Sequence, residues 1–167
     1  GRINVANGDM VGHTGDRRAA ILAVEAVDLA LGRLLLAVRR AGGIALVTAD
    51  HGNADEMYER DKSGRFQVDA HTGRFKPRTS HSLNPVPFVL YDPTALDAPG
   101  AGVTRPPAGI GRGLAAWPRE SDVPGGAWPL SLEVPAGGGG LANVAATCLE
   151  LLGYSAPEAF ATSLLRR

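Results

Sequence analysis

The sequence predicts an α/β fold in which a mostly parallel sheet is flanked by helices. Three observations carry this prediction: a long amphipathic stretch, an apolar β-branched run directly after it, and a second apolar run that follows two prolines. A strand that directly follows a helix is typical of parallel sheets, where helices connect neighbouring strands. The chain has 167 residues, 44% hydrophobic and 20% charged, so it can bury the core of one domain.

The first expected helix spans about residues 16–41, after a polar, glycine-containing segment (residues 1–16) that we expect to be a loop. Thr14 and Asp16 are both candidates to cap its start. The pair Gly42-Gly43 ends it after two arginines that suit the negative end of the helix dipole. Its apolar residues recur at three- and four-residue steps: Ile21, Leu22, Val24, Leu29, Leu31, Leu34, Leu35 and Val38.

Two strands are expected next along the chain. Residues 44–48 form a short run rich in β-branched residues, typical of a strand that is buried on both faces. Residues 86–90 follow Pro85 and contain Pro87, which suits the start of a strand better than its centre. Sites in α/β sheets form at the carboxyl ends of strands, so the polar residues after Thr48 are functional candidates.

Between and after these strands the composition changes twice. Residues 58–79 are polar and charged, and we expect a long exposed excursion. Residues 92–140 are dense in Gly and Pro without any period, which predicts a loop or insertion, partly disordered or packed on the surface, with short strands near 113–116 and 130–134. A last helix is expected from Leu141 to Gly153, and one apolar group follows it near Leu164 and Leu165. The helix shows one apolar face: Leu141, Val144, Ala145, Cys148, Leu151 and Leu152.

Composition excludes several classes of protein. The 17 basic and 17 acidic residues cancel, so no overall charge attracts nucleic acid or an anionic membrane. No apolar stretch is long enough to span a membrane, and the start shows no signal-peptide pattern. Cys148 is the single cysteine and lies in an apolar run, which indicates a buried hydrophobe rather than a nucleophile and excludes an internal disulfide. A cytoplasmic location is expected, with an organelle as the alternative.

Three of the four histidines lie in polar turns flanked by glycine or proline, and two of these turns also offer a carboxylate. Asp9 and His13 are four residues apart in a glycine-rich segment, Asp50 and His51 follow the first strand, and His81 precedes the second. Two carboxylates and three imidazoles suit divalent cations such as Mn²⁺, Co²⁺ or Zn²⁺, and the lack of paired cysteines argues against structural zinc. Each pair alone is weak, because a capping Asp or a surface His explains it equally well. The fourth histidine, His71, lies in the charged excursion and is expected to be exposed.

Four stretches resemble the motifs of cofactor-independent phosphoglycerate mutases. Residues 4–15 (Asn-Val-Ala-Asn-Gly-Asp-Met-Val-Gly-His-Thr-Gly) resemble the signature loop of that family, and residues 48–57 its second metal motif. Residues 79–87 resemble the third motif in its plant and trypanosomatid form, and residues 140–153 the closing helix. The order and spacing also agree, so the resemblance covers most of residues 3–91 and 139–167.

The resemblance implies a two-metal site of the alkaline phosphatase superfamily, with Mn²⁺ expected first and Co²⁺, Mg²⁺ or Zn²⁺ as alternatives. Asp9, His13 and His81 match the ligands of one metal, and Asp50 and His51 match ligands of the other. In this family the second metal also takes an upstream Asp and the nucleophilic Ser that becomes phosphorylated. No serine of this chain lies in a matching context, so we expect no catalytic residue in it.

The resemblance also implies that residues 1–167 are the C-terminal portion of the metal-binding phosphatase-like domain, with residues 92–140 as an insertion. The chain opens at Gly1 without Met, and we expect it to be a piece of a mutase that interconverts 3-phosphoglycerate and 2-phosphoglycerate in glycolysis. Phosphoglycerate would bind only with the upstream segments, and the chain alone is expected to be inactive. A partner chain could cover the sheet edge that the missing strands would leave exposed.

Two other functions stay open from the sequence. The first is a catalytically inactive, mutase-derived subunit with a structural or interaction role in a larger assembly. The Gly/Pro-rich segment and the start of the chain favour it modestly. The second is another alkaline-phosphatase-like enzyme, such as a phosphopentomutase or a sulfatase, which the residues 4–15 motif disfavours.

Overall fold

The computed structural model describes residues 1–93, 130–136 and 138–166. The chain forms two compact units: residues 1–34 with 48–87 make the first, and residues 35–47 with those from 88 onward make the second. Each unit is described by itself below. The elements in chain order are α1 (Asn7–Gly12), α2 (Arg17–Arg40), β1 (Ala45–Thr48), β2 (Phe88–Tyr91), β3 (Ser131–Leu132), α4 (Ala142–Leu151) and β4 (Leu165–Arg166).

Helix α2 confirms the predicted first helix and its ends. Asp16 is the cap, since its Oδ1 accepts the backbone N–H groups of Arg18 (2.9 Å) and Ala19 (3.1 Å). The C-terminal end closes at Gly42, whose φ of +64° is the left-handed conformation that favours glycine. The next residue, Gly43, donates its N–H to Val38 O at 2.9 Å. The helix therefore ends through the glycine pair that the sequence indicated.

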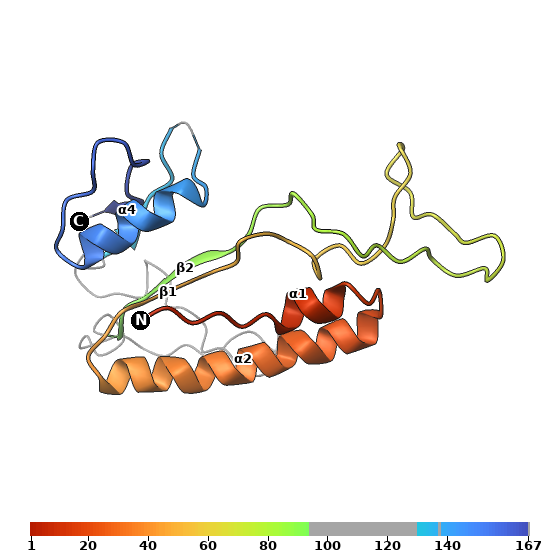
Figure 1. Ribbon diagram of the computed structural model, residues 1–167, viewed down its shortest axis with the longest axis horizontal. Helices are drawn as coiled ribbons and strands as arrows, with labels where there is room; N and C mark the ends of the chain where they lie inside the picture. Colours follow the sequence, from red (N-terminus) through yellow and green to blue (C-terminus); the bar gives the residue numbers. More distant parts are fainter. Residues whose placement is uncertain (94–129, 137, 167) are drawn as a thin grey trace, which may run out of the picture. The chain divides into compact units, whose positions relative to one another are not determined.

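The predicted loop before α2 is wrong for residues 7–12, which form the short helix α1. Its turns are closed by hydrogen bonds from Met10 N to Ala6 O (2.9 Å) and from His13 N to Asp9 O (3.1 Å). Six residues are too few to show an apolar period, and glycines lower helix propensity, so packing rather than local preference explains this helix. Figure 1 shows α1 beside α2, and a Cβ added at Gly8 would lie 3.7 Å from Val24 Cγ2.

Strands β1 and β2 form a two-stranded sheet, as predicted for their positions. The prediction that β1 is buried on both faces is wrong, because Ala45, Leu46 and Val47 are half-buried and Thr48 is exposed in the described structure. The described residues do not form the predicted mostly parallel sheet. Each of the two described sheets has two strands, and β3 and β4 pair antiparallel. Residues 49–87 connect β1 to β2 without the helix that usually links parallel strands. Instead the chain turns back on itself, and an antiparallel bridge joins Gly52 to Ser82.

Residues 58–79 form the predicted exposed excursion, which runs out and back as paired segments (Figure 1). Isolated antiparallel bridges join Tyr58 to Pro77 and Val68 to Phe75. Its three aromatic rings pack against one another. The ring centroid of Tyr58 lies 5.9 Å from that of Phe66 and 5.5 Å from that of Phe75. The excursion therefore has a small aromatic centre of its own, which its polar composition did not predict.

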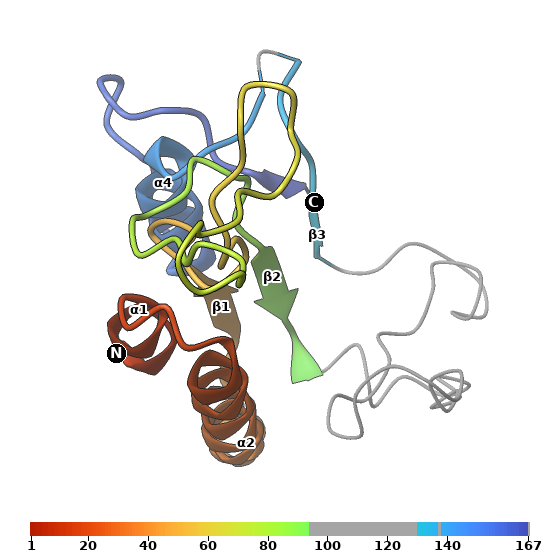
Figure 2. The same ribbon diagram turned by 90° about the vertical axis from the view of Figure 1, so that its right-hand side faces the viewer.

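The second unit contains α4 and the strand pair β3–β4, which is antiparallel with Ser131 opposite Arg166 and Leu132 opposite Leu165. Figure 2 shows the C-terminal segment passing beside α4 into β4. The predicted strand near 130–134 is confirmed by β3, and Leu164, in the apolar group noted near the end of the chain, is 7% exposed. The predicted strand near 113–116, and most of the predicted insertion, lie outside the described residues.

Helix α4 begins and ends as predicted, with Gly153 in the left-handed conformation (φ +83°) after it. Its predicted apolar face is not the face that is buried. The buried residues are Asn143, Ala146 and Thr147, while Leu141 is 47% exposed and Leu152 is 71% exposed in the described structure. The polar face is buried because the C-terminal segment offers backbone groups that form hydrogen bonds with the side chains of Asn143 and Thr147. Among the described helices, none combines the length and the apolar character needed to cross a bilayer.

Candidate metal centre

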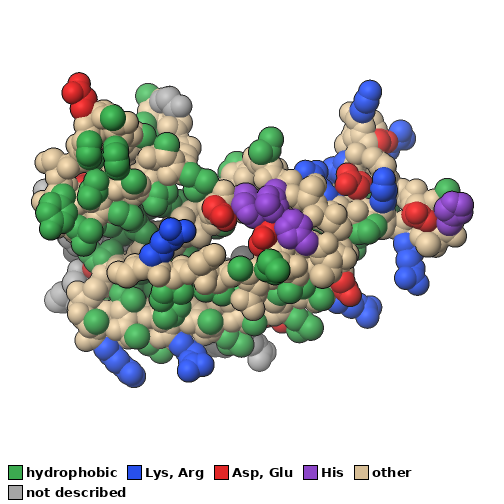
Figure 3. Space-filling view, in the orientation of Figure 1, with side chains coloured by type: hydrophobic (Ala, Val, Ile, Leu, Met, Phe, Trp, Pro, Cys, Tyr) green, Lys and Arg blue, Asp and Glu red, His purple; other side chains and the backbone are tan. Residues whose placement is uncertain are grey.

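The candidate site is built from three segments of the first unit. Helix α1 provides Asp9 from its first turn and His13 directly after its last residue, the turn after β1 provides His51, and the loop before β2 provides His81. On the space-filling view of Figure 3 the histidine side chains of this site form one patch with acidic side chains beside it. Residues more than 60 positions apart in sequence thus share one surface.

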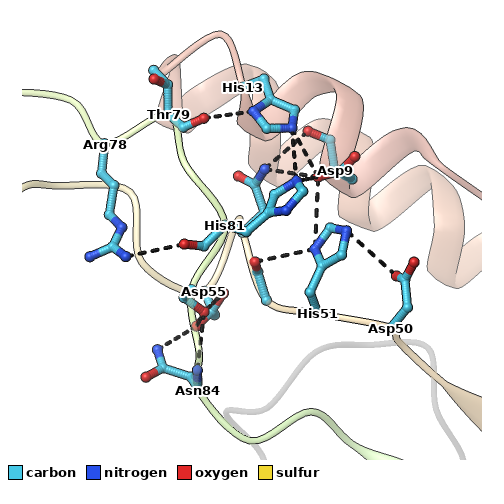
Figure 4. Close-up of polar contacts among 12 residues, drawn as sticks. Asp9, His13, Asp50, His51, Asp55, Arg78, Thr79, His81 and Asn84 are labelled. Carbon is cyan, nitrogen blue, oxygen red and sulfur yellow. Dashed lines mark hydrogen bonds and ion pairs between the residues drawn. The ribbon is translucent and has the colours of Figure 1, made fainter. Parts of the chain in front are cut away.

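Three side chains point at a common centre (Figure 4). Asp9 Oδ1 lies 3.2 Å from His13 Nε2 and 3.2 Å from His81 Nε2. The two histidine Nε2 atoms lie 3.1 Å from one another. Within the residues that the structure describes, no other group of three His, Cys, Asp or Glu side chains converges in this way.

The orientation of His13 prepares its Nε2 atom to bind a cation. His13 Nδ1 lies 2.6 Å from the backbone carbonyl oxygen of Thr79. Because a carbonyl oxygen only accepts, Nδ1 is the nitrogen that carries the hydrogen, and a neutral ring then has its lone pair on Nε2. A hydrogen bond from the outer ring nitrogen to a backbone carbonyl is the usual support of a metal-ligating histidine.

The distances among the three atoms fit one divalent cation. Bonds of about 2.0–2.2 Å that meet at octahedral to tetrahedral angles place neighbouring ligand atoms about 2.8–3.6 Å apart. The observed separations of 3.1 to 3.2 Å fall inside that range. One carboxylate oxygen and two imidazole nitrogens also match the borderline ligand set that Mn²⁺, Co²⁺ and Zn²⁺ accept. The residues present therefore fit a metal ion.

The structure brings only one of the two predicted ligands of the second metal, Asp50 and His51, close to the other site residues. The ring of His51 stacks on that of His81, with centroids 3.6 Å apart and an interplanar angle of 17°. Its Nδ1 lies 4.0 Å from Asp9 Oδ1, at the edge of the first site. The Asp50 side chain is 89% exposed, and its Oδ1 lies 3.7 Å from His51 Nε2. The structure thus brings His51 to the centre and leaves Asp50 directed outward.

Asn53 is a functional residue that sequence reasoning missed, although it lies inside the second motif. It is 6% exposed, and its Nδ2 donates to Asp9 Oδ1 at 2.9 Å. Partial burial would raise the pKa of the Asp9 carboxyl, but this hydrogen bond and the nearby His13, His51 and His81 outweigh it and lower that pKa. Asp9 is therefore held as a carboxylate. An amide two residues after a histidine at a strand end was the available signal.

Arg78 is a second residue that the sequence did not single out. Its Nη2 donates to the backbone carbonyl of His81 at 3.2 Å, and its Nη1 lies 3.2 Å from Glu56 Oε2. Arg78 and Glu56 are about three-quarters buried, so this ion pair is shielded better than a surface pair. The pair fastens the backbone of the His81 loop to the turn after β1.

The Metalloenzyme superfamily profile matches residues 2–156 of this chain. The chain belongs to the Metalloenzyme superfamily. This membership agrees with the three convergent ligand atoms, which lie inside the matched range.

Among the relatives of this Metalloenzyme superfamily chain are proteins named 2,3-bisphosphoglycerate-independent phosphoglycerate mutase. The chain is 41% identical to the one from Trypanosoma brucei brucei over 98% of its own length, and 42% identical to a probable one from Arabidopsis thaliana over 98%. It is also similar to a solved Leishmania mexicana phosphoglycerate mutase, determined at low cobalt concentration, with a TM-score of 0.72, 41% identity and 99% of this chain covered. The resemblance stated from the motifs is confirmed.

The chain spans about a quarter of the length of these mutases, 24% in each case. It shares its fold with the corresponding part of the Leishmania protein. The activity of a whole mutase is therefore a matter for proposal.

Proposed function

We propose that this chain supplies metal ligands to a phosphoglycerate mutase that interconverts 3-phosphoglycerate and 2-phosphoglycerate through a phosphoserine intermediate. The observation that carries the proposal is the convergence of Asp9 Oδ1, His13 Nε2 and His81 Nε2 within 3.2 Å of one another. The names of the relatives give the substrate, and the superfamily gives the dependence on a metal.

In this proposal Asp9, His13 and His81 hold one divalent cation, with Mn²⁺ expected first. The Leishmania mutase was determined at low cobalt concentration, which supports a divalent ion of this size class. Asp50 and His51 contribute to a second metal, and the outward direction of Asp50 suits a site completed by groups from outside this chain. A bound divalent cation would offset the charge of a phosphoryl group and lower the pKa of a nearby hydroxyl.

The nucleophilic serine of the proposal lies outside this chain. Ser82 is adjacent to His81, but its hydroxyl is 3% exposed and donates to Asp55 Oδ2 at 2.8 Å. A buried hydroxyl in that position has no access to a substrate phosphate. The role of this chain's own residues is therefore to hold Asp9 ionised, to direct His13 Nε2 inward and to place His81 beside it.

Phosphoglycerate binding is assigned to the segments of such mutases that have no counterpart here. We place residues 1–167 in the C-terminal part of the metal-binding domain, with residues 92–140 as an insertion. Leu22 and Leu29 of α2 are 67% and 70% exposed in the described structure, which suits an apolar surface covered by the rest of the mutase or by a partner chain. A cytoplasmic location is proposed from the lone cysteine. No finding favours the alternative of an inactive structural subunit.

Calorimetric titration with Mn²⁺ tests the metal site. The wild-type chain is expected to bind Mn²⁺. His13→Ala removes one of three ligands and is expected to lower the affinity by at least about 100-fold, the upper end of the effect of losing a residue that only orients a ligand. His71→Ala is the matched control, because His71 is exposed in the excursion and should leave binding unchanged. Equal affinities of wild type and His13→Ala would refute the assignment.

A coupled assay of the natural protein that contains this chain tests the activity. We expect Mn²⁺-dependent conversion of 3-phosphoglycerate to 2-phosphoglycerate that is lost in His81→Ala and kept in His71→Ala. Residues 1–167 alone are expected to show no turnover. Metal binding without any mutase activity of the natural protein would favour the inactive subunit instead.

A further inference from the structure

Asp55 connects the turn after β1 to the loop that carries His81. Its Oδ2 accepts hydrogen bonds from Ser82 Oγ at 2.8 Å and from Asn84 Nδ2 at 2.6 Å. Its Oδ1 lies 3.1 Å from the same Ser82 hydroxyl. Both donors are more than 25 residues away in sequence, and both belong to the loop that follows His81. One carboxylate thus joins the two segments that bear His51 and His81.

The backbone geometry beside Asp55 shows that this contact is tightly packed. Ser82 N donates to Gly52 O at 2.8 Å, and the two residues form an antiparallel bridge. A Cβ added at Gly52 would collide with Ser82 Oγ and would lie 2.5 Å from Asp55 Oδ1. Only glycine lets the two strands approach this closely. The contact is therefore a fixed junction, with Ser82 almost fully buried.

The carboxylate form of Asp55 is maintained at neutral pH. Partial burial would raise the pKa of Asp55, but the hydrogen bonds from Asn84 and Ser82 outweigh it and lower that pKa. An ionised carboxylate accepts only, so it can bind both donors at once.

The junction fixes the register of two histidines. His51 precedes Gly52 and His81 precedes Ser82, so the bridged residues are the direct neighbours of the two rings. Those rings stack at 3.6 Å, and His81 Nε2 then reaches His13 Nε2 and Asp9 Oδ1 (Figure 4). A shift of the His81 loop would move a ligand atom away from the centre.

The geometry points to Asp55 as a positioning residue of the metal centre: it holds His81 in register with His51 and touches no ligand atom itself. This inference rests on the proposed function, because it concerns the same site. The excursion beyond the junction has its own closing bonds, such as Arg78 N to Met57 O at 3.0 Å and the Tyr58–Pro77 bridge. Loss of the Asp55 carboxylate should therefore displace His81 and leave the excursion folded.

The test compares Asp55→Ala with the wild-type chain by two measurements. In the metal-free chain, nuclear Overhauser contacts between the ring protons of His51 and His81 report the stack, and they are expected to disappear in the variant. The affinity for Mn²⁺, measured by calorimetry, is expected to fall roughly 10–100-fold, as for other residues that orient ligands. Asp55→Asn keeps one accepting oxygen for Ser82 and should recover part of both signals.

Asp61→Ala is the matched control, since Asp61 also accepts several hydrogen bonds, but only from Ser63 and Arg65 within the excursion. It should leave the ring contacts and the Mn²⁺ affinity unchanged. If Asp55→Ala does not fold, Asn84→Ala removes a single donor and should produce the same two changes to a smaller extent.

The outcomes separate the two proposals. Wild-type ring contacts and wild-type affinity in Asp55→Ala would overturn the role of Asp55 and leave the metal site standing. A wild-type chain that binds no Mn²⁺ would overturn the proposed function, and the metal-free ring contacts would still decide whether Asp55 positions His81.

Discussion

The candidate metal centre of the first unit and the Asn143–Thr147 network of the second are polar clusters of opposite kinds. In the network each donor meets its own acceptor: Thr147 Oγ1 donates to Asn143 O at 2.8 Å and accepts the Leu164 N–H at 2.9 Å. Asn143 accepts the Gly140 N–H at 2.8 Å and donates to Thr162 O at 2.7 Å. In the metal centre, two imidazole nitrogens face each other across a single carboxylate oxygen.

The difference shows which features separate a structural cluster from a candidate binding site. Thr147 is fully buried, and its satisfied hydrogen bonds fasten the C-terminal segment to α4. The side chains of His13 and His81 are 41% and 48% exposed, and their Nε2 atoms lie 3.1 Å from one another and 3.2 Å from the same oxygen, Asp9 Oδ1. A buried, fully hydrogen-bonded network stabilises a fold by itself. An exposed carboxylate oxygen and two imidazole nitrogens that meet at one point are instead a ligand set that suits a divalent cation.

Gly12→Ala is expected to have the largest effect, because it breaks the packing on which the metal centre depends. An added Cβ at Gly12 would collide with Asn53 Oδ1 and lie 2.8 Å from Asn53 Cγ. Such overpacking costs roughly 1–3 kcal/mol. It also displaces the amide that binds Asp9, so that Mn²⁺ affinity should fall with stability.

Urea denaturation and calorimetry measure the two effects of Gly12→Ala. The control is Gly32→Ala in α2, where an added Cβ meets no atom within 4 Å. That change should stabilise the helix by about 0.5–1 kcal/mol and leave metal binding unchanged. A Gly12→Ala chain as stable as Gly32→Ala would show that the centre tolerates movement of Asn53.

Thr147→Val should produce the next largest effect and should separate the two clusters. The change keeps the shape of the side chain but leaves the Leu164 N–H without its acceptor. The expected cost is about 1–2 kcal/mol, the range for an unsatisfied buried donor. Hydrogen exchange of the Leu164 amide should therefore accelerate by about tenfold, while Mn²⁺ affinity stays at the wild-type value.

Thr162→Val serves as the control for Thr147→Val, since Thr162 is exposed and contributes only its backbone carbonyl to the network. A loss of Mn²⁺ affinity in Thr147→Val would contradict the separation of structural and ligand-binding clusters.

Lowering the pH should have the smallest effect. It should act on the exposed turns of the excursion, whose hydrogen-bond donors are paired with the carboxylates of Asp61 and Asp69. Hydrogen bonds from Ser63 and Arg65 lower the pKa of Asp61, and hydrogen bonds from Thr72 lower the pKa of Asp69, both below the ordinary 3.8. Since the folded-state pKa is depressed, this stabilisation is fully present above about pH 3.8 and is lost as pH falls through the folded-state values. Amide chemical shifts of Ser63 and Thr72 should titrate with midpoints below 3.8, and midpoints at or above 3.8 would contradict the turn contacts.

The sequence predicted the elements whose signals are local. Helix α2 has a long apolar period, a capping Asp16 and a terminal glycine pair, and all three features predict its ends within a few residues. The strands at 45–48 and 88–91 followed from apolar runs next to turn residues. The convergence of Asp9, His13 and His81 was implied by the motif resemblance, and the structure agrees with it.

The features that were missed depend on partners distant in sequence. Helix α1 is too short to show a period, and α4 buries Asn143 and Thr147 because a segment some twenty residues later offers matching backbone groups. Asp55 showed no signal either, since its donors lie near residue 83 and a lone carboxylate in a turn most often caps or faces water. A sequence pattern indicates which functional group lies at a position, but it rarely indicates which distant residues form hydrogen bonds with that group.

The closed stem of the excursion has a consequence for how this region can change in length. Backbone hydrogen bonds of 3.0 Å join residue 57 to residue 78 and residue 59 to residue 76. Glu56 forms an ion pair with Arg78 across this stem and a second one with Arg60 on its own side. The turns at Gly64 and Gly73 lie beyond these bonds. Because the entropy of closing a loop rises only slowly with its length, inserted residues at those tips would leave the spacing of His51 and His81 untouched. A reporter peptide inserted at the Gly64 or Gly73 turn is therefore expected to leave His51 and His81 in place.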